Sequence, residues 1–169
     1  MPEPVEKFSW FAAKTRFGQE LKIKEALEAR KIQHFIPVDY KKDYRGKLRP
    51  SPVIKNLVFL YATKAVACSL KVDMGLPLMY MFDYANHRML EVPDKQMDDF
   101  IRVFDMSEDT GGLMNVSLER GDRVRVVKGP LVGVEGTVLE LHGKHFIEVN
   151  LIGLLSARAS VPRSYMEKI

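Results

Sequence analysis

The sequence lacks the features that mark disulfide-bonded, membrane or secreted proteins, namely several cysteines, a long apolar run or a signal peptide. Its single cysteine, Cys68, allows neither a disulfide within the chain nor a cysteine zinc site. No apolar run approaches the ~20 residues of a membrane-spanning helix. The first ten residues lack the basic and apolar pattern of a signal peptide. We therefore expect a cytoplasmic protein.

Recognisable catalytic groups are also scarce. There is no phosphate-binding Gly-Lys-Ser/Thr loop and no Gly-x-Ser-x-Gly nucleophile motif. The four histidines show no metal-ligand spacing, and His142 and His145 flank Gly143 in an expected turn. Cys68 lies among apolar neighbours in an expected helix, which favours a structural thiol. We expect no enzyme, no metal site and no cofactor.

Positive charge, by contrast, is concentrated in one place. The chain has 169 residues and a net charge of +4, and its length fits one domain or two small ones. The segment 41–55 holds six basic residues and one acid. Such a cluster is a candidate phosphate contact, although a solvated hairpin is the simpler alternative. The basic residues are Lys41, Lys42, Arg45, Lys47, Arg49 and Lys55.

Residues 1–104 alternate strand-like and helix-like patterns, which predicts an α+β domain with an antiparallel sheet. We expect strands over 8–14, from 35, and over 57–62, 78–84 and 89–92. Helices are expected over 19–32, 64–71 and 94–104. Thr63 suits the N-cap of the second helix. In the last helix an apolar stripe predicts packing against a sheet; it consists of Met97, Phe100, Ile101 and Phe104.

The pattern changes after residue 104. Residues 105–117 are acidic, contain two adjacent glycines and show no periodicity, which predicts a flexible linker. Residues 118–169 show short strands over 122–127, 134–141, 145–151 and 157–161, followed by a turn near 163–167. This half is expected to form a small β-barrel.

One stretch in the second half, 121–138, resembles the KOW motif. Val124 and Val126 alternate with arginines, as in a half-buried strand. A Gly-Pro turn follows, and then Gly133 and Gly136, which would permit a positive φ and a close approach of strands. Any tight hairpin could show this spacing. The motif is matched at Gly121, Asp122, Val124, Val126, Gly129, Pro130, Gly136 and Val138.

Together with the linker and the order of elements, four further segments resemble NusG-type transcription factors over the whole chain. The resemblance implies an NGN-like α+β domain over 1–104, a linker over 105–117 and an SH3-like KOW barrel over 118–169. The segments are Trp10-Phe11, Phe35-Ile36-Pro37, Asn56–Leu60 and Leu151-Ile152-Gly153.

Two positions depart from the family pattern. Ile54-Lys55 stands where the family has Phe-Pro, and Leu57 replaces a tyrosine. Both belong to the apolar surface with which the family grips RNA polymerase. The chain therefore resembles a specialised branch of the RfaH and UpxY kind.

The resemblance implies an elongation or antitermination factor with three contacts. The first domain would dock on the clamp helices of the largest polymerase subunit. The basic segment would face non-template DNA or nascent RNA. The KOW domain would reach a ribosomal protein or a termination factor. The expected polymerase contacts are Trp10, Phe11, Ile54, Leu57, Phe59, Met79 and Phe82. The expected contacts of the KOW domain are Leu151, Ile152, Leu154 and Leu155, for which barrel packing is the alternative.

An RNA-binding or ribosome-associated KOW protein without a polymerase role is the second hypothesis. It would use the same basic segment. The two hypotheses differ over Trp10, Leu57 and Met79, which a polymerase-binding protein must expose unless its own KOW domain covers them.

Overall fold

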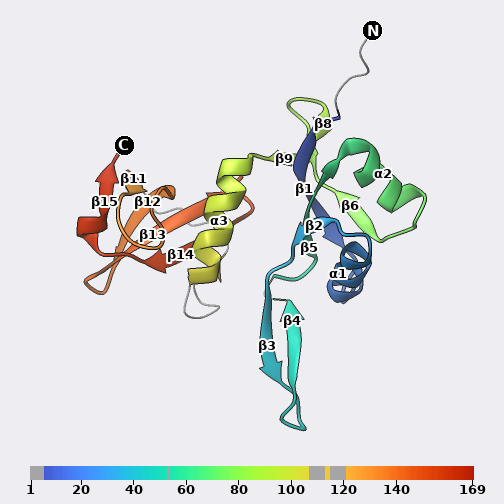
Figure 1. Ribbon diagram of the computed structural model, residues 1–169, viewed down its shortest axis with the longest axis horizontal. Helices are drawn as coiled ribbons and strands as arrows, with labels where there is room; N and C mark the ends of the chain where they lie inside the picture. The colour runs from blue at the N-terminus through green and yellow to red at the C-terminus, as the bar shows by residue number, and fades with distance from the viewer. Residues whose placement is uncertain (1–5, 53, 107–112, 115–120) are drawn as a thin grey trace. The chain divides into compact units, whose positions relative to one another are not determined.

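The computed structural model describes residues 6–52, 54–106, 113–114 and 121–169, and the chain forms two compact units, Met1–Pro93 and Asp94–Ile169 (Figure 1). Each unit has its own sheet. No helix in the described part of the chain is long and apolar enough to cross a membrane.

The first unit is built on an antiparallel sheet in the order β2-β5-β1-β6, with β9 also paired to β1. The long central pair aligns Phe8 with Thr63 and Lys14 with Leu57. These two strands come from the apolar, aromatic runs that the sequence places near 8–14 and 57–62. The strands are β1 (Phe8–Thr15), β2 (Gln33–Phe35), β5 (Leu57–Thr63), β6 (Leu78–Tyr80) and β9 (Glu91–Val92).

Two helices, α1 (Glu20–Ala29) and α2 (Lys64–Val72), cover one face of this sheet. Ile23 and Leu27 of α1 are fully buried, as their helical spacing predicts. Thr63 caps α2, its hydroxyl accepting a hydrogen bond from the Val66 amide at 3.3 Å. Helix α1 ends earlier than residue 32, because Lys31 adopts a left-handed φ of 55°.

Two hairpins leave the main sheet. β3 (Val38–Lys42) pairs with β4 (Leu48–Pro52), and β7 (Phe82–Asp83) pairs with β8 (Arg88–Met89). In Figure 1 the β3–β4 hairpin extends away from the sheet and helices of its own unit.

The second unit is rich in antiparallel strands, in the order β10-β14-β13-β12-β11-β15. We expected a small β-barrel; the β-rich unit fits this, but in the described part of the chain no pairing joins the two end strands and closes the sheet. The strands are β10 (Leu113–Met114), β11 (Arg123–Val126), β12 (Glu135–Leu141), β13 (Lys144–Leu151), β14 (Leu155–Ser160) and β15 (Met166–Lys168).

The glycines of the 121–138 stretch are required by this packing. A Cβ on Gly136 would lie 2.3 Å from the carbonyl oxygen of Glu148 on β13, and one on Gly121 would lie 2.1 Å from that of Val138. Gly133 has a φ of +91°. The strand approach and the left-handed turn expected from the sequence are therefore both present.

Helix α3 (Asp94–Met106) packs against β13 and β14 of the second unit. Met97, Phe100 and Val103 are fully buried, whereas Ile101 and Phe104 are only half-buried. The domain boundary after residue 104 stays a prediction. By their internal contacts, the compact units divide between Pro93 and Asp94. Most of the expected linker lies outside the described residues; its Leu113 and Met114 form β10 and pair with β14.

Candidate nucleic-acid and protein interfaces

The tip of the β3–β4 hairpin is organised by Asp43. Its Oδ1 accepts hydrogen bonds from the amides of Arg45, at 2.9 Å, and Lys47, at 3.0 Å. Its backbone amide donates to the Lys47 carbonyl, and the Gly46 amide donates to the Asp43 carbonyl, each at 2.9 Å. Gly46 takes a φ of 77°, which a residue with a side chain adopts less readily. The turn is therefore held by its own hydrogen bonds.

All six predicted phosphate-binding residues are exposed. Five of them lie on the hairpin, where Lys41 faces Arg49 across the two strands. Arg49 Nε also contacts Asp43 Oδ2 at 3.2 Å. Lys55 lies outside the hairpin, with its Nζ 5.8 Å from the centre of the Phe17 ring. The structure thus gathers five cations on one ribbon and leaves Lys55 apart from its strands.

The charge of Asp43 persists to low pH. A hydrogen bond from the Lys47 amide, followed by those from Arg49 and Arg45, holds the pKa of the Asp43 carboxyl below its usual range, and desolvation opposes this only in part. One negative charge therefore stays at the centre of the basic tip, where it fixes the backbone.

The hairpin also carries large apolar side chains, which its charge pattern alone does not indicate. Tyr44 is 90% exposed, Tyr40 62% and Leu48 59%. The Arg45 guanidinium carbon lies 5.2 Å from the centre of the Tyr44 ring. The alternation of tyrosine with lysine and arginine over 40–45 is the signal that could have found them.

The seven residues expected to bind polymerase divide into two groups. Four lie in the interior with at most 8% exposure, because they occupy the central strands β1 and β5: Trp10, Phe11, Leu57 and Phe59. Met79 and Phe82 are exposed, and Ile54 is half-buried.

Strand alternation does not explain this division, because Trp10, Leu57 and Phe59 lie on the same sheet face as Met79. Phe11 points to the helix-covered face and belongs to the core there. Leu57, Lys14 and Met79 form one cross-strand row on the opposite face. Of the three side chains that separate our two hypotheses, Met79 is exposed, whereas Trp10 and Leu57 are buried.

The loop expected to bind a partner of the second domain is partly core. Leu151 and Leu155 are buried in the sheet, so packing accounts for them. Ile152 and Leu154 are half-buried. The Ile152 amide donates a 2.9 Å hydrogen bond to Gln96 Oε1 of α3, so the helix fixes this turn.

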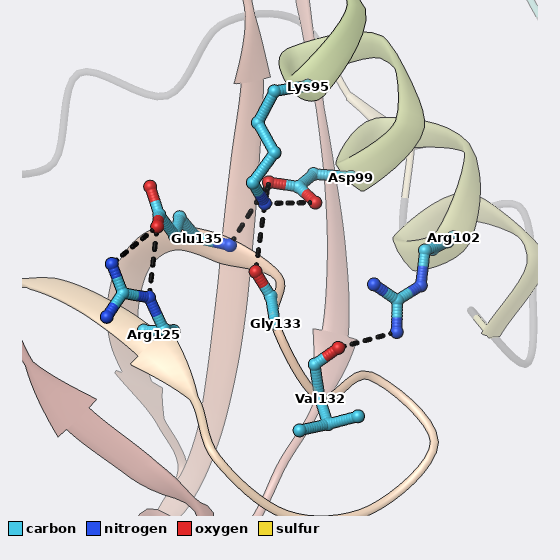
Figure 2. Close-up of polar contacts among 7 residues, drawn as sticks. All are labelled: Lys95, Asp99, Arg102, Arg125, Val132, Gly133 and Glu135. Atoms are coloured by element: carbon cyan, nitrogen blue, oxygen red, sulfur yellow. Dashed lines mark hydrogen bonds and ion pairs between the residues drawn. The ribbon is translucent and has the colours of Figure 1, made fainter.

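Helix α3 is also joined to the loop before β12 by polar contacts (Figure 2). Lys95 Nζ lies 2.6 Å from Asp99 Oδ2 and 2.9 Å from the Gly133 carbonyl oxygen. Asp99, only 4% exposed, accepts a hydrogen bond from the Glu135 amide at 3.2 Å. Arg102 Nη2 donates to the Val132 carbonyl at 2.8 Å. The contacts from α3 to residues 132–135 were not expected from the sequence, because they join residues 30 or more positions apart in the chain.

An ion pair borders this network. Arg125 Nη2 lies 2.8 Å from Glu135 Oε1. The hydrogen bond from Arg125 lowers the pKa of the Glu135 carboxyl. The pair links β11 to the first residue of β12, and both side chains remain partly solvated.

The cysteine differs from our expectation. Cys68 is exposed, because Ala67 and Leu70 are the residues of α2 that face the core. Among the residues that the structure describes, no group of three or more histidine, cysteine or acidic side chains could hold a metal ion.

Comparison with known proteins identifies the first half of the chain. Residues 8–101 match the family model of NusG, described as a transcription termination factor. The match includes most of α3. A comparison with curated proteins gave no match.

Among solved structures, one of NusG from Thermotoga maritima, whose title describes a domain interaction, superposes with a TM-score of 0.50. The two sequences are 20% identical, and the alignment covers 96% of this chain and 98% of that chain. At this identity the likeness concerns the fold alone.

Proposed function

The chain belongs to the NusG family of transcription factors, and from that premise we propose that it acts in elongation or antitermination. Its N-terminal domain docks on the clamp helices of RNA polymerase, and its second domain recruits a further partner. The family match over residues 8–101 carries the proposal. A clamp held closed over nucleic acid suppresses pausing or termination without any chemistry by the bound factor.

The proposed polymerase contact is centred on Met79. It is 54% exposed and shares a row with Lys14 and Leu57 on the sheet face opposite α1 and α2. Phe82 is 42% exposed and lies close by in the chain. Buried Trp10 and Leu57 support this surface from within the sheet. An exposed methionine and phenylalanine suit an apolar contact between proteins.

The proposed nucleic-acid contact is the β3–β4 hairpin. Its five exposed cations stand on a ribbon that is not part of the main sheet. Contacts to phosphates release counterions, so this binding weakens as salt rises. For the second domain, we propose that the partner meets Ile152 and Leu154, because Leu151 and Leu155 are occupied in the core.

Polymerase capture with Met79→Asp tests the proposal. Substitution of Leu57 is unsuitable, because that side chain is buried and an aspartate there would destabilise the sheet. At position 79 the aspartate carboxylate is in contact with solvent and lies across the strands from Lys14, whose charge is opposite. The fold is therefore retained. We expect binding to fall about tenfold or more, as for a residue central to an interface.

Val72→Asp is the matched control, since Val72 is 76% exposed on α2 and lies outside the proposed surface. The proposal is supported if wild type and Val72→Asp bind and Met79→Asp does not. Equal binding of all three removes Met79 from the interface. If neither the wild-type chain nor a chain with residues 105–169 removed binds, the polymerase role is rejected.

The alternative is an RNA-binding KOW protein, which has no need of an exposed apolar face and so accommodates the burial of Trp10 and Leu57. That function keeps the basic hairpin and predicts RNA binding without polymerase capture. The same capture experiment therefore separates the two functions.

A further inference from the structure

The β3–β4 hairpin presents more than positive charge. Residues 40–42 and 44–50 are all exposed, and only Asp43 is half-buried. Tyr40, Tyr44 and Leu48 therefore contribute little to a core. Phosphate binding accounts for the lysines and arginines but gives no reason for large apolar side chains in water.

The strand register sorts these side chains by face. Tyr40 faces Pro50, and Lys42 faces Leu48, so one face of the ribbon combines aromatic, apolar and cationic groups. Lys41 and Arg49 lie on the other face.

Tyr44 stands at the tip of the ribbon. It is held there by the turn that Asp43 organises, and it is the most exposed large apolar side chain of the described residues. Arg45 lies over its ring at 5.2 Å. The ring and the guanidinium together form a small platform with a cation beside it.

From this arrangement we propose that Tyr44, assisted by Tyr40, stacks on unpaired bases of a single-stranded nucleic acid. The neighbouring lysines and arginines contact its phosphates. This inference rests on the proposed contact between the hairpin and nucleic acid, and it adds which form of nucleic acid is preferred. Aromatic rings among cations are the usual means of binding single strands, because every base has a face that can stack.

A duplex does not offer the same contact. Its base faces are stacked inside the helix, so an exposed tyrosine gains nothing from them unless a pair is opened. A two-stranded ribbon could instead enter the major groove. In that case phosphate and base-edge contacts would dominate and loss of the Tyr44 ring would weaken duplex binding.

The test measures binding of the full chain by fluorescence anisotropy. The probes are labelled oligothymidylate and oligouridylate of about 12 nucleotides, within the usual site size, and a DNA duplex of the same length. Tyr44→Ala should weaken binding to at least one single strand roughly five- to a hundredfold, the effect of losing one stacked base. Duplex affinity should change by less than about twofold. The single strand that loses more identifies DNA or RNA as the ligand.

Tyr44→Phe keeps the ring and should bind like wild type. Lys47→Ala, a phosphate contact, should weaken single-strand and duplex binding alike and reduce the salt dependence by about one released ion. Circular dichroism should be unchanged in every variant, since both side chains are exposed.

The stacking inference is overturned if Tyr44→Ala leaves single-strand binding unchanged or weakens duplex binding equally. If Lys47→Ala then still weakens binding, the phosphate contact stands and stacking alone fails. If wild type binds none of the probes, the hairpin's proposed role in nucleic-acid binding fails as well. Polymerase capture is measured in a separate experiment, so the proposed polymerase contact and the proposed base stacking can each fail without the other.

Discussion

At the tip of the β3–β4 hairpin, one carboxylate fixes a turn of five residues. Asp43 accepts two backbone amides and one guanidinium, and these bonds favour its charged form. The pKa of Asp43 is lower in the folded chain than in the unfolded one. Its contribution to the stability of the folded chain is therefore complete above the unfolded pKa of about 3.9. That contribution is lost as the pH falls through the lower, folded value.

We therefore predict that the hairpin tip loosens only in acid, below pH 3.9. The amide resonances of Arg45 and Lys47 should titrate together with a midpoint under that value, as measured by NMR. Asp43→Asn removes the ionisable group and should abolish the titration. A midpoint at or above the usual value for aspartate would contradict the hydrogen-bonded turn.

The sequence could predict which residues are apolar but not always which face they reach. It identified Trp10 and Leu57 as members of an apolar sheet, and the structure buries both. Their exposure depends on neighbours that a one-dimensional pattern does not contain. Cys68 shows the opposite error, since the register of α2 turns it to solvent. The basic hairpin was predictable because charge clustered in the chain also clusters in space.

Helix α3 forms where the sequence predicts a helix, but the strands on which it packs belong to the second unit. The stripe containing Met97 and Phe100 requires a sheet as its partner, and the structure supplies β13 and β14. Periodicity states that a helix has an apolar face but not which sheet receives it. Contacts between residues distant in sequence decided this, including the bond from the Glu135 amide to Asp99.

Removal of the Asp99 carboxylate should weaken this packing. Asp99→Ala leaves the Glu135 amide without its acceptor and Lys95 without its ion pair. We expect the free energy of unfolding to fall by about 1–3 kcal/mol. The Glu135 amide should also lose protection in hydrogen exchange.

Asp98→Ala is the control, because Asp98 is exposed on the same helix. It should change stability by no more than about 0.5 kcal/mol. Equal effects of the two substitutions would show that Asp99 does not anchor α3.

At the scale of the whole molecule, the boundary of the family match and the boundary of the compact units differ. The match ends at residue 101, whereas the units divide before Asp94. Helix α3 thus belongs to the family domain by sequence and to the second unit by its packing on β13 and β14.

This difference can be measured with two fragments. Residues 94–169 retain α3, whereas residues 107–169 lose it, keep β10 and expose the strands that α3 covers. Burial of Met97, Phe100 and Val103 stabilises the longer fragment by roughly 1.5–3 kcal/mol per side chain before entropy is counted. We expect its urea midpoint, followed by circular dichroism, to be clearly higher. Equal midpoints would mean that α3 adds nothing to the second unit.

The hairpin has a further consequence because its turn is closed by its own hydrogen bonds and its residues 40–42 and 44–50 are exposed. Its exposed side chains carry little of the packing of the first unit, so they can be exchanged without disturbing the sheet from which they extend. Target preference can therefore drift, or be engineered, by replacing about a dozen residues as one cassette. In this molecule, the residues that set the proposed ligand preference are therefore different from the residues that set the fold.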